Sequence, residues 1–150
     1  MLRISKLADY AVMIVAKMAQ QPDRIYSASE LVEMTALNLP TVRKLLKTLS
    51  TQKILIAKRG AEGGYSLAMQ PLEISLVDII EAVDGKIAFT ECCQPDDHHC
   101  QLVKCQMSGA WARINWRIRN VLDEVKILEF VMTEKNRTFP EAVNGSLSSK

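Results

Sequence analysis

The side chains with the most reactive chemistry in this chain are four cysteines, which all lie in the segment from Cys92 to Cys105. Cys92, Cys100 and Cys105 follow the spacing Cys-x7-Cys-x4-Cys. A chain of 150 residues can bury a core without disulfides, so clustered thiols indicate metal ligation or redox chemistry. The side chains of adjacent residues diverge, and we expect only one of Cys92 and Cys93 to be a ligand.

Thiolates in this arrangement can hold either an iron-sulfur cluster or a zinc ion, and their chemistry alone leaves the two about level. Zinc prefers short ligand pairs, of which Cys100 and Cys105 form one, with His98 and His99 nearby. A thiol redox switch is the third interpretation. The helix predicted to follow Cys105 favours a ligand site with net negative charge, because a helix N-terminus attracts anions.

The elements that must position this segment begin with three helices. Apolar residues at helical spacing predict the first over residues 6–19. Ser27 followed by Glu30 is a capping-box pattern, which predicts a second helix that runs to about Thr35. Pro40 suits the first turn of a third helix, after a short connection.

The third helix has two different faces. Its apolar stripe has the spacing of a core-facing surface and consists of Val42, Leu45, Leu46 and Leu49. The opposite face carries Thr41, Arg43, Lys44, Lys47 and Thr48. Residues 1–60 hold 10 Lys and Arg against 4 Asp and Glu, although the whole chain has a net charge of +2. Two short helices, the second with a basic face, are typical of a DNA-binding helix-turn-helix.

A β-hairpin is predicted directly after the third helix. Residues 54–58 and 65–68 read as short strands, and glycine-rich residues 59–64 form the turn between them. In this position the hairpin would be the wing of a winged helix, with Arg59 at its tip able to enter a minor groove. A fourth helix starts after Ser75 and stops at Gly85. The expected fold is mainly α with a small β-hairpin, with a winged helix-turn-helix domain over residues 1–85.

The remaining chain divides into a cysteine-rich loop over 86–107, a long helix over about 108–134 and a flexible tail over 135–150. The long helix carries apolar residues separated alternately by three and four positions, namely Trp111, Ile114, Ile118, Val121, Val125, Leu128 and Met132. This heptad pattern predicts packing against the same helix of a second copy in a twofold homodimer. The alternative is that these residues cover the winged domain.

Several classes of function find no support in the sequence. No apolar run approaches the roughly 18 residues of a membrane span, and no signal peptide is recognisable, so we expect a cytoplasmic protein without a membrane partner. No nucleophile-base set, phosphate loop or acid-base pair indicates an enzyme or a small-molecule substrate.

Several motifs together resemble the IscR/NsrR-type family of iron-sulfur winged-helix transcription regulators. They are the opening residues 2–11, the wing 59–65, the run 74–84, and three cysteines followed by Ala110-Trp111. Within that family, Thr90-Glu91-Cys92 and residues 111–115 look most like regulators encoded with SUF iron-sulfur assembly operons. The similarity covers about residues 1–134.

This resemblance implies a homodimer that binds double-stranded promoter DNA and regulates iron-sulfur assembly genes, with repression as the expected direction. By position, Pro40, Thr41, Arg43 and Lys44 would meet the major groove, and Arg59 with Gly60 would form the wing contact. Cys92, Cys100 and Cys105 would hold the cluster, for which we expect the 2Fe-2S form rather than 4Fe-4S, with zinc as the alternative.

The chain also departs from the family pattern. Members with a 2Fe-2S cluster place a histidine three residues after the third cysteine, where this chain has Ser108. Nitric-oxide-sensing members can use a first-helix aspartate as fourth ligand, and Asp9 occupies that kind of position. Arg43 replaces an acidic residue of some relatives, which bears on DNA sequence preference. The alternatives are therefore a nitric oxide sensor, a zinc-stabilised interaction module that does not bind DNA, and a cluster carrier.

Overall fold

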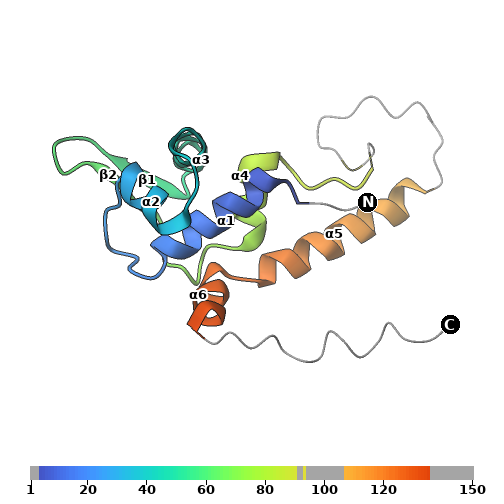
Figure 1. The fold of residues 1–150 in the computed structure, drawn as a ribbon. Helices are drawn as coiled ribbons and strands as arrows, with labels where there is room; N and C mark the ends of the chain where they lie inside the picture. Colours follow the sequence, from blue (N-terminus) through green and yellow to red (C-terminus); the bar gives the residue numbers. More distant parts are fainter. Residues whose placement is uncertain (1–3, 91–92, 94–106, 136–150) are drawn as a thin grey trace.

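The computed structural model describes residues 4–90, Cys93 and residues 107–135, and this part is mostly helical (Figure 1). The elements in chain order are α1 (Lys6–Met18), α2 (Ala28–Thr35), α3 (Leu39–Thr51), β1 (Leu55–Lys58), β2 (Gly64–Leu67), α4 (Leu76–Asp84), α5 (Ser108–Glu124) and α6 (Ile127–Lys135). The predicted first four helices and the hairpin are confirmed. The predicted tail 135–150 falls, apart from Lys135, outside the described residues.

Local capping explains where these helices begin. The Ser5 hydroxyl accepts a hydrogen bond from the Ala8 N–H at 3.1 Å and starts α1. Ser27 and Glu30 form the predicted reciprocal capping box at the start of α2. Asn38, which the sequence analysis did not single out, caps α3 by accepting from the Thr41 N–H at 2.9 Å. Such caps satisfy N–H groups that have no partner inside the helix.

The hydrophobic core lies among α1, α2, α3, α4, α6 and the hairpin. The predicted stripe of α3 is buried at all four positions, Val42, Leu45, Leu46 and Leu49. These side chains belong to one cluster that also includes Ile14 and Met18 of α1 and Leu31 of α2. Burial of this stripe turns the opposite, basic face of α3 outward.

The hairpin is antiparallel, with Leu55 opposite Leu67 and Lys58 opposite Gly64. Tyr26 extends this pairing, because its N–H and C=O each form a 2.8 Å hydrogen bond with Tyr65 of β2. A Cβ atom at Gly64 would lie 2.5 Å from the Tyr26 carbonyl oxygen. The wing is therefore fixed to the chain that leads into α2.

The prediction of one continuous helix over 108–134 is wrong, because two helices occupy this range. Val125 is extended, with φ −76° and ψ 113°. Its carbonyl accepts from the Leu76 N–H, and the Ile127 N–H donates to the Ile74 carbonyl, both at 2.9 Å. Pairing with the chain before α4 thus replaces the helical hydrogen bonds at this point. The break directs α6 back onto α1, where Ile127 and Val131 join the core.

Candidate functional site

The outward face of α3 is basic and accessible. Of the residues predicted to meet a DNA groove, Pro40, Arg43, Lys44 and Lys47 are exposed and Thr41 is half-buried. No acidic residue occurs anywhere in α3. The structure therefore brings the helix-turn-helix candidates together on one surface.

The wing adds a second basic element. Arg59 and Gly60 are exposed in the loop between β1 and β2, which extends away from the helices (Figure 1). Gly60 has a φ of 121°, which L side chains rarely adopt, and its carbonyl accepts from the Gly63 N–H at 3.0 Å. Lys58 is also exposed at the end of β1, although the sequence analysis did not name it. Its place at the end of the predicted strand, directly before Arg59, could have identified it.

The cations of α3 and the wing have no acidic partner within the described part of the chain. Ion pairs join Arg24 to Glu30 at 2.6 Å and Arg119 to Glu81 at 3.0 Å. Within residues 4–90 and 107–135, no ion pair engages Arg43, Lys44, Lys47, Lys58 or Arg59. These five cations, called the basic surface below, are available to an anionic partner.

The predicted ligands Cys92, Cys100 and Cys105 lie outside the described residues. The described part reaches their neighbour Cys93, which is half-buried and unbridged. Its N–H donates to the Thr90 carbonyl at 2.9 Å, and the Thr90 hydroxyl donates to its sulfur at 3.3 Å.

The far side of the cysteine segment is the start of α5. Met107 occupies the N-cap position, and no side chain caps this helix. The free N–H groups and the helix dipole favour negative charge here. Three thiolates around iron or zinc would carry such charge, so the donor set fits either group beside this helix end.

Asp9, the candidate fourth ligand, is exposed on the first turn of α1. It lines a shallow pocket with Val12, Met13 and Ala16 of α1 and with Phe130 of α6. Its carboxylate is thus open to a group supplied from outside the subunit.

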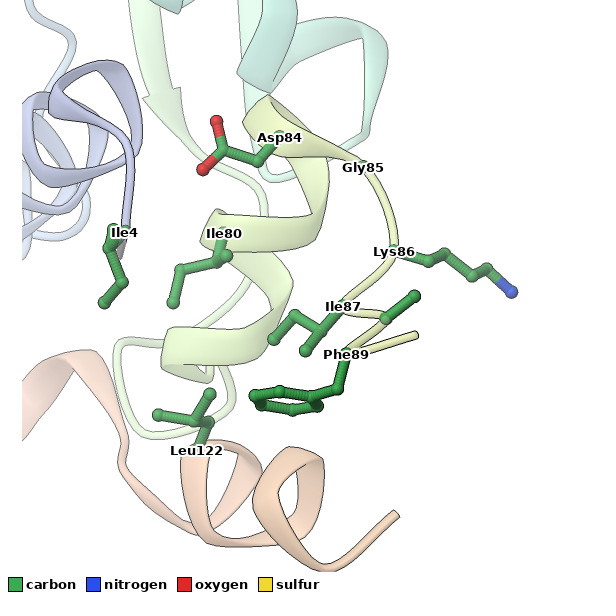
Figure 2. Close-up of a pocket in the computed structure, with 9 residues that line it drawn as sticks. Ile4, Ile80, Asp84, Gly85, Lys86, Ile87, Phe89 and Leu122 are labelled. Carbon is green, nitrogen blue, oxygen red and sulfur yellow. The ribbon is translucent and has the colours of Figure 1, made fainter. Parts of the chain in front are cut away.

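The chain that leads from α4 toward the cysteines is held in a groove between α4 and α5. Figure 2 shows Ile87 and Phe89 directed toward Ile80 of α4 and Leu122 of α5, around a pocket of about 230 Å³. Lys86 points away from this pocket (Figure 2).

Polar side chains also hold this segment. Glu81 of α4 accepts from Arg119 of α5 through both carboxylate oxygens, at 3.0 and 3.2 Å. These hydrogen bonds raise the pKa of Arg119. One Glu81 oxygen also accepts from the Ile87 N–H at 3.4 Å, and the Asn115 side-chain oxygen accepts from the Phe89 N–H at 3.2 Å. Sequence reasoning gave these residues no role.

The apolar residues predicted to form a dimer contact do not form one continuous stripe. Trp111, Ile114 and Val121 are exposed on α5, whereas Ile118 is half-buried. Val125 lies at the helix break, and half-buried Leu128 and exposed Met132 belong to α6. Trp116, outside the heptad pattern, is 63% exposed.

A helix-turn-helix followed by a two-stranded wing, both with exposed cations, defines a winged-helix protein of the DNA-binding class. A family model described as Rrf2, iron-dependent transcriptional regulator, matches residues 4–133. The chain belongs to the Rrf2 family. It is a transcription regulator of the helix-turn-helix type.

Three similar proteins illustrate the relationship. The regulator IscR of Vibrio cholerae is 26% identical over 133 residues, which cover 87% of this chain and 76% of IscR. The structure of CymR, the global cysteine regulator of B. subtilis, superposes with a TM-score of 0.68 at 25% identity and covers 88% of this chain and 98% of CymR. That of T. potens IscR has a TM-score of 0.67 at 23% identity, with 93% of each chain covered.

Among the described residues, no helix has both the length and the apolar character required to cross a lipid bilayer.

Proposed function

We propose that this regulator is a homodimer that represses iron-sulfur assembly genes of the SUF type and senses cluster status through Cys92, Cys100 and Cys105. The observation that carries the proposal is the unpaired basic surface of α3 and the wing in a chain of the Rrf2 family. The similarity to IscR of Vibrio cholerae supports the cluster part of the proposal.

The DNA-binding part assigns α3 to the major groove and the wing to the minor groove. Pro40, Thr41, Arg43, Lys44 and Lys47 would contact the major groove or its phosphates. Arg59 and Gly60 would supply the wing contact. Arg59→Ala should weaken binding to the operator, measured by fluorescence anisotropy at several salt concentrations. Unchanged affinity would remove the wing assignment.

The homodimer part rests on the exposed apolar residues of α5. Trp111, Ile114 and Val121 are exposed within the described chain. Aromatic residues are typical of interface centres, so these side chains suit a contact with a second copy. The N-terminal half of α5 extends away from the body formed by α1–α3 (Figure 1). Ile114→Glu should produce monomers in sedimentation equilibrium. A stable dimer in that variant would place the contact elsewhere.

The cluster part is tested by its own spectroscopy. Anaerobic purification should give a coloured protein with iron and sulfide in equal amounts, as a 2Fe-2S cluster requires. A colourless protein loaded with zinc would instead favour the zinc-stabilised module. Cys92→Ala should lose the cluster and Cys93→Ala should keep it, because Cys93 already interacts with Thr90. Equal retention by both variants would contradict this ligand choice.

Regulation requires that the cluster-loaded and cluster-free forms differ in affinity for DNA. Loss of the cluster in iron starvation or oxidation would then change promoter occupancy. Operator binding by the two forms, compared under anaerobic conditions, measures this difference directly. Equal affinity would leave the protein a DNA-binding regulator without cluster control.

A nitric oxide sensor is the second candidate, and the exposure of Asp9 on α1 favours it. In that case Asp9 of one subunit would complete the cluster site of the other. Asp9→Ala should then alter the absorption spectrum of the reconstituted protein and its reaction with nitric oxide. An unchanged spectrum would assign the fourth ligand to another group.

A further inference from the structure

Residues 86–90 connect α4 to the cysteine segment, and their backbone is held by side chains instead of by a neighbouring strand. Ile87 and Phe89 are two residues apart, and both of their N–H groups donate to side chains of the neighbouring helices. Glu81 accepts from the first of these groups and Asn115 from the second. The bond to Asn115 is the shorter, at 3.2 Å against 3.4 Å.

Asn115 and Arg119 lie one turn apart on α5, which places both on the face toward α4. Arg119 fixes the Glu81 carboxylate by two hydrogen bonds, and only 16% of the Glu81 side chain is exposed. The same segment is anchored on its apolar side, where Ile87 and Phe89 point toward Leu122 of α5 (Figure 2). Polar and apolar contacts therefore hold this segment against α5.

Described residues flank the cysteine segment on both sides. Phe89 precedes Cys92 by three residues, and Ser108, the first residue of α5, follows Cys105 by three residues. Asn115 is seven residues beyond Ser108, or about 10 Å along the helix axis at 1.5 Å per residue. The described residues on either side of the cysteine segment, Phe89 and Ser108, are thus both joined to α5.

We propose that Asn115 is a positioning residue for the thiolate site: its hydrogen bond to the Phe89 N–H tethers the cysteine segment to α5 and pre-organises the three ligands. This inference rests on the proposed cluster site. Fixing both ends of a segment restricts its conformations before the ligand binds, so less entropy is lost on binding. Glu81, held by Arg119, supports the same tether by accepting from the N–H of Ile87, two residues before Phe89.

The test compares three variants of the full-length protein. Asn115→Leu removes the acceptor at similar size, and Asn115→Asp keeps an acceptor oxygen. Asn120→Leu is the matched control, because Asn120 lies on the same helix and forms no hydrogen bond to residues 86–90 in the described chain. Each protein is reconstituted anaerobically with ferrous iron and sulfide, and loss of the cluster absorption is followed after addition of EDTA. Amide hydrogen exchange at Phe89 is measured on the cluster-free proteins.

Asn115→Leu should lose the cluster about fivefold faster than the wild type, the change expected for one neutral hydrogen bond, and Phe89 should exchange faster by a similar factor. Asn115→Asp should restore both properties, and Asn120→Leu should match the wild type. Equal cluster loss in Asn115→Leu and the wild type would overturn the tether. A wild type that takes up no cluster would refute the proposed function separately. In that case unchanged Phe89 exchange in Asn115→Leu would also overturn the tether.

Discussion

Lys44→Gln provides a quantitative test of the basic surface. Lys44 is exposed on α3 and takes part in no ion pair within the described chain, so its charge is available to a DNA phosphate. Each phosphate contact contributes about 0.9 to the slope of log affinity against log salt concentration. Loss of one contact from each subunit of a dimer should therefore reduce the magnitude of the slope by about 1.8. Between 50 and 200 mM salt, wild-type affinity should fall about tenfold more than that of the variant.

The assay is operator binding by fluorescence anisotropy over this range of salt concentrations. Lys86→Gln is the matched control, because Lys86 is also exposed but lies after α4 and points away from the pocket there (Figure 2). The control should keep the wild-type slope, and circular dichroism should show that both variants are folded. An unchanged slope in Lys44→Gln would refute the assignment of Lys44 to a phosphate.

Three further predictions concern folding of the winged helix. Leu46→Ala should destabilise the protein by about 2–5 kcal/mol in urea unfolding, because Leu46 has 0% exposure; a loss below about 1 kcal/mol would contradict its core position. Hydrogen bonds from Ser27 lower the pKa of Glu30. The ionised Glu30 side chain therefore stabilises the fold fully above the ordinary glutamate pKa, and this stabilisation is lost as the pH falls through the lowered pKa of the folded protein. Glu30→Gln should thus be less stable than the wild type at neutral pH, and melts in acid should show no difference. Gly64→Ala should lose about 1–3 kcal/mol, because the added Cβ meets a carbonyl oxygen at 2.5 Å; Gly109→Ala, whose Cβ meets nothing within 4 Å, should show no such loss.

The helix-turn-helix could be predicted because its signals are local. The capping box at Ser27, the proline at position 40 and the apolar stripe of α3 each act within one or two turns of helix. Burial of that stripe also decides which face of α3 is exposed, so the basic candidates followed from the same pattern. The wing was predictable because glycines at its turn satisfy a local backbone requirement.

The proposed cysteine site follows from the sequence only as chemistry, and it stays a prediction. Residue type and spacing indicate thiolate ligation, whereas the hydrogen bond from the Phe89 N–H to Asn115 joins residues 26 positions apart in the chain. Nothing near Asn115 in the sequence indicates that its side chain accepts from that N–H, because the contact depends on how α4 packs against α5.

The end of α5 shows most clearly the difference between what local sequence predicts and what tertiary contacts decide. The sequence of residues 108–134 contains no proline to stop a helix, and its only glycine is at position 109, so the heptad pattern predicted a continuous one. Only the tertiary structure decided that the chain breaks at Val125, because backbone pairing with Ile74 and Leu76 and burial of Ile127 outweigh local helix propensity. The sequence by itself determined the winged helix and its basic face, which depend on nearby residues, and it predicts the thiolate chemistry. The separation of α5 from α6 and the hydrogen bonds that hold residues 86–90 depend on contacts that exist only once the helices pack.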